Sequence, residues 1–391
     1  MNIYIYLKVS KLNKSYVNSY LNSTGVLIFI QTMPLVLYIL RNDIGSEYSD
    51  TTLITFIITL FVSSIFSYIG YKVGFSKSLN IDVLKLNPSS LGIRLILVFS
   101  FVFALISFGL LGYKGVGIYT WITNNRYAYI IGRSGLGVYY VIFQLMIIAF
   151  VTSVLFIKAS KSFKIICILI IILFSYFTGS KGFLLALIIS LLFFYDMFVK
   201  KLTYKKILII ALLFILSFKF LLSIQSQMSI FDYAGKDFYQ NYLMLLNAFF
   251  YGNLEHFNGK LLLEDFLWSL VPRNIYSEKP FIYGHSTLVA FFYGEQTVIN
   301  GSTPSFTALG VPFADFGTIG VLIISITRGF FQGMGERSLR NLLWENGPLY
   351  MPYFLYIILF VFSIPSFSTL YLLFISMIFI LFIRLFYRRR K

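Results

Sequence analysis

The polar residues best suited to chemistry lie between residues 225 and 307, the longest interruption in a series of apolar, membrane-length segments. Arg273 follows a proline and Lys279 precedes one, so the backbone beside each cation is restricted. A guanidinium matches phosphate oxygens in pairs, whereas an ammonium binds them as a point charge. This pattern is typical of a phosphate-binding site. A lipid headgroup, or the neighbouring Glu278, is the alternative partner for either cation.

Both histidines of the chain, His256 and His285, lie in the same stretch. His285 follows a glycine and is a candidate general base, because imidazole is the side chain that ordinarily titrates nearest neutral pH. Asp315 is a second candidate, since an acid at or just inside a membrane segment is costly to bury. Pairing with Arg273 or Lys181 is the structural alternative for Asp315. The histidines lack metal-ligand spacing, so we expect no metal site, and no cofactor is implied.

A second set of cations lies in shorter loops. Lys181 follows Ser180 in a glycine-flanked turn between two apolar segments. Ser180, or the free amides of the next helix, could bind an anion; an ordinary tight turn whose lysine reaches the membrane interface is equally compatible. Arg126 and Arg133 belong to the loop 113–137, where they could pair with lipid phosphate or with external acids.

Membrane helices must position these residues. The 391-residue chain is 58% hydrophobic and 12% charged, with a mean hydropathy of +0.81, whereas about a quarter of a soluble domain is charged. A helix crosses a bilayer with roughly 20 apolar residues. Segments of about this length predict spanning helices at 25–41, 52–70, 91–112, 138–157, 162–178, 182–199, 206–224, 308–333, 350–365 and 367–385. We therefore predict an all-α polytopic membrane protein of about ten transmembrane helices.

The organisation expected is a single membrane domain, 1–391, with 225–307 inserted as a subdomain between the seventh and eighth helices. Glycines and a proline interrupt the eighth segment. Within the insertion, the apolar runs 239–251 and 261–270 predict amphipathic helices that lie on the bilayer surface.

Orientation follows from the basic residues. Most of the 32 lysines and arginines flank the same ends of the predicted helices, and most acidic residues flank the opposite ends. Positive loops are cytoplasmic, so both termini are predicted inside, and 225–307 and 113–137 outside. The net charge of +17 is then a topology signal that requires no nucleic-acid partner. Cys167, the single cysteine, excludes an intramolecular disulfide. The N-terminal residues lack the apolar core of a cleavable signal peptide, so the first helix is expected to direct insertion.

This arrangement resembles the Wzy family of bacterial oligosaccharide repeat-unit polymerases. The residues that carry the resemblance are Gly179-Ser180-Lys181-Gly182, Pro272-Arg273, Lys279-Pro280, Thr303-Pro304-Ser305 and the run from Asp315 to Gly320. The family commonly has Ser-Arg-Gly where this chain has Ser180-Lys181-Gly182. The lysine keeps the cation and loses the bidentate geometry of arginine.

The resemblance implies a GT-C-like glycosyltransferase of the bacterial inner membrane that acts in O-antigen or similar polysaccharide biosynthesis. Such an enzyme transfers the growing glycan from undecaprenyl pyrophosphate to the non-reducing end of a new lipid-linked repeat unit, without a nucleotide sugar. Membrane lipids, a chain-length regulator and a flippase of the same pathway are the implied partners. On this hypothesis Arg273 is the main pyrophosphate contact, and His285 and then Asp315 are the base candidates. The supporting cationic and polar contacts are Lys279, Lys181, Ser180, Arg126 and Arg133.

Two other functions fit the same topology. An O-antigen ligase has a similar large external loop and transfers glycan to lipid A-core instead. A lipid-linked oligosaccharide flippase would be a transporter, a class that usually has shorter external loops and helices in repeated halves. The sequence has no Walker loop, dinucleotide fingerprint, nucleophile elbow or zincin motif, which argues against ATP-driven chemistry.

Overall fold

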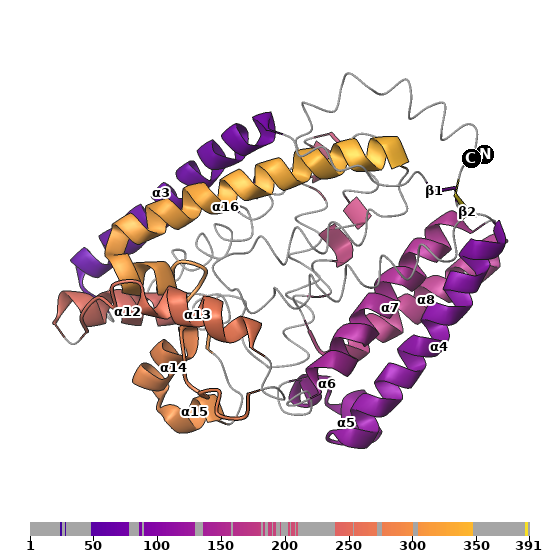
Figure 1. Ribbon diagram of the computed structural model, residues 1–391, viewed down its shortest axis with the longest axis horizontal. Helices are drawn as coiled ribbons and strands as arrows, with labels where there is room; N and C mark the ends of the chain where they lie inside the picture. The colour runs from indigo at the N-terminus through magenta and orange to yellow at the C-terminus, as the bar shows by residue number, and fades with distance from the viewer. Residues whose placement is uncertain are drawn as a thin grey trace.

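The computed structural model describes most of five long apolar helices and of the 225–307 insertion (Figure 1). The described residues are 24–25, 28, 48–77, 86–87, 90–129, 136–157, 159–180, 183, 187–189, 191–192, 196, 202–203, 205–207, 209, 239–252, 254–271, 276–299, 304–346 and 388–389. Within them the only strands are β1 (Leu86–Asn87) and β2 (Arg388–Arg389), a short antiparallel pair. All other elements are helical, as predicted.

Within the described part of the chain, four helices are long and apolar enough to cross a membrane. They are α3 (Asp50–Ser76), α4 (Ser90–Lys114), α7 (Gly137–Phe156) and α16 (Gly310–Asn346). The shorter apolar helix α8 (Lys161–Phe177) matches a fifth predicted segment. The predicted segments 25–41, 182–199, 206–224, 350–365 and 367–385 lie wholly or mostly outside the described residues. The chain is therefore an integral membrane protein by its helices, and the count of ten stays a prediction.

Helix α3 has an inverted distribution of polarity that suits a lipid environment. Its buried face carries Thr59, Ser63 and Ser67, each at most 1% exposed. Its outer face carries large apolar side chains, among them Phe61 at 67% and Ile54 at 57% exposure. Water would favour the opposite arrangement, whereas lipid solvates the apolar face and leaves the polar groups to pair between helices.

Helices α3 and α16 pack in parallel through glycines on both partners. A Cβ atom at Gly74 would lie 1.9 Å from the Phe330 carbonyl oxygen, and one at Gly329 would lie 2.0 Å from that of Ser67. Gly70 and Gly333 complete a GxxxG spacing on each helix. Such spacing lets two membrane helices approach at backbone distance. The sequence analysis did not predict this pairing.

Hydrogen bonds follow the same parallel register into the second half of α16. Ser325 donates to the Ser63 hydroxyl at 2.8 Å, and Arg328 Nη2 donates to Ser67 Oγ at 3.1 Å. The Arg328 side chain is only 3% exposed. It therefore lies between two helices. Arg337 reaches the end of α3, where it donates to the Phe75 carbonyl at 3.0 Å.

Helices α4, α7 and α8 form a second group (Figure 1). Phe108 of α4 stacks on Phe177 of α8 at 4.9 Å and contacts Phe143 of α7 at 5.5 Å. Cys167 is buried in this group, in agreement with a role as a small apolar residue. The short helices α5 (Ile118–Thr123) and α6 (Asn125–Tyr127) follow α4.

The 225–307 insertion contains four described helices: α12 (Gln240–Phe250), α13 (Lys260–Leu270), α14 (His285–Tyr293) and α15 (Glu295–Ile299). Figure 1 shows α14 and α15 toward the same lower edge of the view as α5 and α6. The prediction that 225–307 and 113–137 lie on one side of the membrane stays a prediction. Which side is external remains a prediction.

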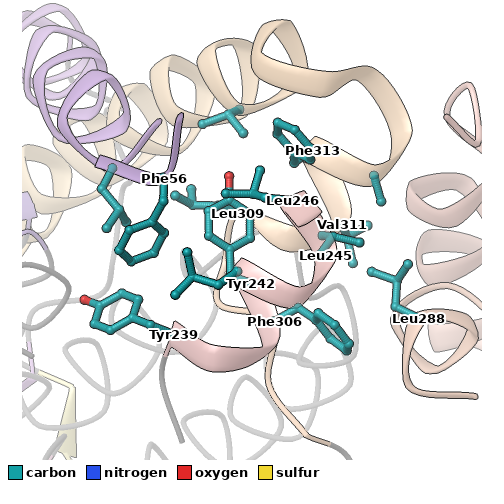
Figure 2. Packing of buried hydrophobic residues seen from close by; sticks show 14 of the residues in the cluster. Phe56, Tyr239, Tyr242, Leu245, Leu246, Leu288, Phe306, Leu309, Val311 and Phe313 are labelled. Carbon is teal, nitrogen blue, oxygen red and sulfur yellow. The ribbon is translucent and has the colours of Figure 1, made fainter. Parts of the chain in front are cut away.

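Helix α12 does not lie on the bilayer surface as predicted. Figure 2 shows its Tyr242, Leu245 and Leu246 packed between α3 and the start of α16. All three side chains are fully buried, and the Tyr242 hydroxyl donates to Thr59 of α3 at 3.2 Å. The surface prediction was wrong for α12 because its apolar face packs on other protein helices. Helix α13 does expose an apolar face, formed by Leu263, Phe266 and Leu267.

Candidate functional site

The predicted site residues of the insertion converge on a kink in α16. Gly317 interrupts this helix with φ 64° and ψ −149°, a backbone conformation that favours glycine. The Ala314 and Asp315 carbonyls accept N–H groups from outside α16. Phe257 N donates to the first and Asn258 N to the second, each at 3.1 Å. The segment before α13 is therefore fixed to the kink through its backbone.

Asp315 joins the kink to the N-terminus of α13. Its Oδ1 accepts the Leu261 N–H at 3.1 Å, and its Oδ2 accepts the Leu262 N–H at 2.8 Å. The side chain is fully buried. A carboxylate that accepts the first free amides of a helix stabilises that helix end. Both oxygens of this sequence-predicted residue thus have backbone partners.

His256 lies against the same kink. Its Nδ1 is 3.2 Å from the Ala314 carbonyl oxygen, and its ring stacks on Phe249 with the centroids 4.5 Å apart. The residue is nonetheless exposed. A Cβ atom at Gly317 would lie 3.3 Å from both Cε1 and Nε2 of the histidine. Glycine at this position leaves that edge of the ring uncovered.

Two carboxylates of α13 hold the N-terminus of α14. Gly284 N donates to Glu264 Oε2 at 2.9 Å, and His285 N donates to Asp265 Oδ1 at 3.2 Å. Gly284 is required here because a Cβ atom would lie 2.1 Å from Asp265 Oδ1, and its φ is 53°. The chain of contacts thus runs from Asp315 through α13 to His285.

Burial gives the two partners at the start of α14 shifted pKa values. It raises the pKa of Asp265 to about 6; the His285 N–H lowers that pKa, and the nearby Glu264 and Asp315 raise it. Burial also lowers the pKa of His285 to about 4. The His285 ring is therefore neutral at pH 7, and it packs edge-on against Phe306 with the centroids 5.8 Å apart.

Lys279 is held just before α14. Its Nζ donates to the Val271 carbonyl at 3.0 Å and lies 5.0 Å from the centroid of the Tyr283 ring. A cation over an aromatic face is stabilised by the ring quadrupole. Val271 is two positions before Arg273, which itself lies outside the described residues. The amine of Lys279 is thus fixed beside the start of the segment that carries Arg273.

Of the remaining predicted residues, Ser180 lies in the turn that follows α8. Ser180 Oγ accepts the Phe183 N–H at 3.2 Å, which caps the next helix. At Gly179, φ is 60° and a Cβ atom would lie 2.3 Å from the Asn125 carbonyl oxygen. The turn at 178–180 therefore packs directly on α6, whose central residue is Arg126. The Arg126 side chain, Lys181 and Arg133 lie outside the described part of the chain.

Comparison with known proteins gives two curated relatives, both named O-antigen polymerase, from Salmonella typhimurium and Salmonella typhi. Each is 24% identical to this chain over 256 residues. The chain is distantly similar to O-antigen polymerases. The resemblance predicted from the sequence is thereby confirmed as a distant similarity. The matched region covers 62% of the chain and 58% of each relative. No protein-family model and no solved structure matches the chain significantly.

The sequence analysis did not select three residues of this site: Glu264, Asp265 and His256. Asp265 and Glu264 stood among many loop acids, and nothing in the sequence placed them at the start of α14. His256 was named and not selected, because its contact with the α16 kink joins residues 58 positions apart. The interruption of α16 itself was predicted, because glycines and a proline break the apolar segment there.

Proposed function

We propose that this protein is a membrane glycosyltransferase that polymerises lipid-linked oligosaccharide repeat units, as in O-antigen biosynthesis. The observation that carries the proposal is the similarity to O-antigen polymerases over 256 residues. Two features of the structure support it: an integral membrane body, and a polar site built where the insertion meets the kink of a membrane helix.

The proposed reaction exchanges one bond to an anomeric carbon for another. The bond between the growing glycan and undecaprenyl pyrophosphate breaks, and the lipid pyrophosphate leaves with the bonding electrons. A hydroxyl at the non-reducing end of the incoming lipid-linked unit forms the new glycosidic bond. Its proton goes to a base on the protein. No oxidant, metal or nucleotide sugar is needed for this balance.

The cations of the insertion suit the leaving group. Negative charge develops on the pyrophosphate as the bond breaks, and preorganised cations stabilise such charge. Lys279 supports this role because its amine is held by Val271 and Tyr283, next to the segment of Arg273. We propose Arg273 as the main pyrophosphate contact and Lys279 as its support. Further contacts are assigned to Lys181, Arg126, Arg133 and Ser180.

The two base candidates from the sequence have different surroundings. His285 stays one candidate for the base: its ring is neutral at pH 7, but a pKa near 4 gives it a weak affinity for a proton. For Asp315 the geometry favours positioning, because both carboxylate oxygens accept α13 amides. Its proposed contribution is to hold α13, and through it His285, at the kink.

Glycan gels separate the proposed function from its two alternatives. Deletion of the gene of a polymerase leaves core carrying one repeat unit, whereas deletion of a ligase gene leaves bare core. Loss of a flippase would leave no external repeat unit, and the purified protein would move lipid-linked glycan across vesicles without elongating it. Core that carries a single repeat unit is therefore the outcome that identifies loss of a polymerase.

The direct test uses the full chain in liposomes with undecaprenyl-pyrophosphate-linked repeat units. We expect the wild-type protein to form chains longer than one unit and to release undecaprenyl pyrophosphate. Arg273→Ala should abolish long chains at unchanged protein level. Arg94→Ala is the matched control, because Arg94 lies near the start of α4, at the end away from the loop 113–137. Wild-type protein that forms no polymer would remove the proposal.

A further inference from the structure

The position of His256 sets it apart from the other polar side chains of the site. It contacts the kink of α16, a membrane-spanning helix, and it remains exposed. His285 is buried enough to lose most of its proton affinity, and Asp315 is fully enclosed. Of these three described residues, His256 is thus the most accessible.

The contact with Ala314 fixes the tautomer of the His256 ring. A carbonyl oxygen can only accept a hydrogen bond, so Nδ1 carries the proton in the neutral ring. The lone pair then resides on Nε2. A histidine oriented through one nitrogen and open at the other is the arrangement used for general-base catalysis.

Phe249 and Gly317 determine how the lone pair is presented. Phe249 stacks on the ring face, with the planes 24° apart, and so fixes the ring plane. Gly317 lies beside the Nε2–Cε1 edge and contributes no side chain there. The ring is therefore held on its face and at Nδ1, and its Nε2–Cε1 edge faces Gly317, which carries no side chain.

We propose that His256 is a catalytic residue whose Nε2 accepts the proton of the attacking sugar hydroxyl. This inference rests on the proposed polymerase function. In the step, the acceptor oxygen forms its bond to the anomeric carbon while the bond to the lipid pyrophosphate breaks. The hydroxyl proton moves to Nε2, which makes the ring a cation. The Ala314 carbonyl stabilises that cation through the Nδ1–H bond.

The contact with Ala314 also permits a purely structural role for His256: its Nδ1–H would help to satisfy the Ala314 carbonyl, which the kink leaves without its helical partner. The two roles use different ring nitrogens, and this permits a clean separation. His256→Asn keeps a side-chain N–H that can reach the Ala314 carbonyl and removes Nε2. His256→Ala removes both groups. A structural role requires the first variant to behave like wild type and the second to fail.

The experiment measures chain elongation by the full protein in liposomes, from about pH 5 to pH 9. We expect His256→Asn to lower kcat by about 100-fold or more, the usual contribution of a general base. We also expect it to abolish the fall in rate at acid pH, with little change in KM. His285→Asn, assayed in parallel, tests the other candidate: loss of the acid limb in that variant alone would assign the base to His285 instead. Near-wild-type kcat with the limb intact in His256→Asn would overturn the proposal.

A second measurement tests the proposal if His256→Asn does not accumulate as folded protein. His256→Ala, isolated as monodisperse protein, is assayed with and without added imidazole. Recovery of elongation with imidazole supports the base assignment, and failure of intact protein to recover contradicts it. The wild-type reaction separates this inference from the proposed function. An inactive wild type disproves polymerisation, whereas an active wild type with a fully active His256→Asn disproves only the role of His256.

Discussion

The Asp315 carboxylate accepts the backbone N–H of Leu262 at 2.8 Å, and this contact joins the kink of α16 to the start of α13. The same carboxylate also accepts the Leu261 N–H. Because α13 in turn supplies Glu264 and Asp265 to the start of α14, the kink sets the positions of α13 and of the first residues of α14. Asp315 thus positions the site indirectly, through the backbone amides whose hydrogen bonds it accepts.

Asp315→Asn should therefore impair stability together with activity. The amide NH2 would face one of the two donor N–H groups, which leaves a buried donor without an acceptor. We expect a loss of about 1–3 kcal/mol in unfolding free energy, seen as a lower midpoint in a thermal melt of the detergent-solubilised protein. The residual activity should keep the wild-type pH profile. A stable variant that has lost only its acid limb would instead identify Asp315 as the base.

The glycine contacts between α3 and α16 give a prediction for assembly. Gly74→Ala and Gly329→Ala place a methyl group against backbone atoms of the partner helix, at 1.9 Å and 2.0 Å in the present geometry. The helices must separate, so we expect a marked loss of folded protein on size-exclusion chromatography. Gly109→Ala, in α4, is the matched control, because no neighbouring atom lies within 4 Å of a Cβ atom at that position. Normal yield from both test variants would show that the pair tolerates a wider spacing.

Local sequence predicted the helices well and their partners poorly. Runs of apolar residues were enough to place α3, α4, α7 and α8, and glycines and a proline indicated the interruption in α16. The pairing of α3 with α16 joins segments more than 250 residues apart, and its glycines have no sequence feature that names the partner helix. Composition likewise could not tell whether the apolar face of α12 meets lipid or protein.

The site followed the same rule. Arg273, Lys279 and His285 were selected from local backbone features, and the structure holds Lys279 and His285 in ordered positions beside α14. Pairing with Arg273 or Lys181 was one of two alternatives for Asp315, whereas its observed partners are amides of α13. Backbone amides carry no residue-type signature, so a contact of this kind is invisible in a single sequence.

Opposite pKa shifts at Asp265 and His285 predict a compensated pH response. The raised pKa of Asp265, about 6 in the folded state, stabilises the protein at low pH, and this contribution is lost as the pH rises through about 6. The lowered pKa of His285, about 4, gives a contribution that is present above the ordinary histidine pKa and lost as the pH falls toward 4. The two effects oppose each other between about pH 4 and 6.

Single variants should expose each effect. Asp265→Asn retains only the histidine effect, so its stability in thermal melts should fall as the solution is acidified from pH 6 to 4. Melts of His285→Asn retain only the aspartate effect, so stability should rise over the same interval. Wild type should vary less than either. Parallel curves for all three proteins would rule out titration of this pair as a source of the pH response.

Lys279 provides the last prediction, which concerns substrate binding. Its amine is fixed by Val271 and by the Tyr283 ring, so removal of the cation should weaken the hold on a lipid pyrophosphate without unfolding the insertion. We expect Lys279→Ala to raise KM for the lipid-linked unit about tenfold, and Lys279→Arg to retain most of the affinity because the charge is kept.

Tyr283→Leu should give a smaller effect, since the cation–π contact contributes only about 0.5–1 kcal/mol at a partly exposed site. Added salt should reduce the difference between wild type and Lys279→Ala, because screening weakens the lost interaction in the wild type alone. Equal KM values for wild type and Lys279→Ala at low salt would exclude Lys279 from the pyrophosphate contact and leave it a structural role between α13 and α14.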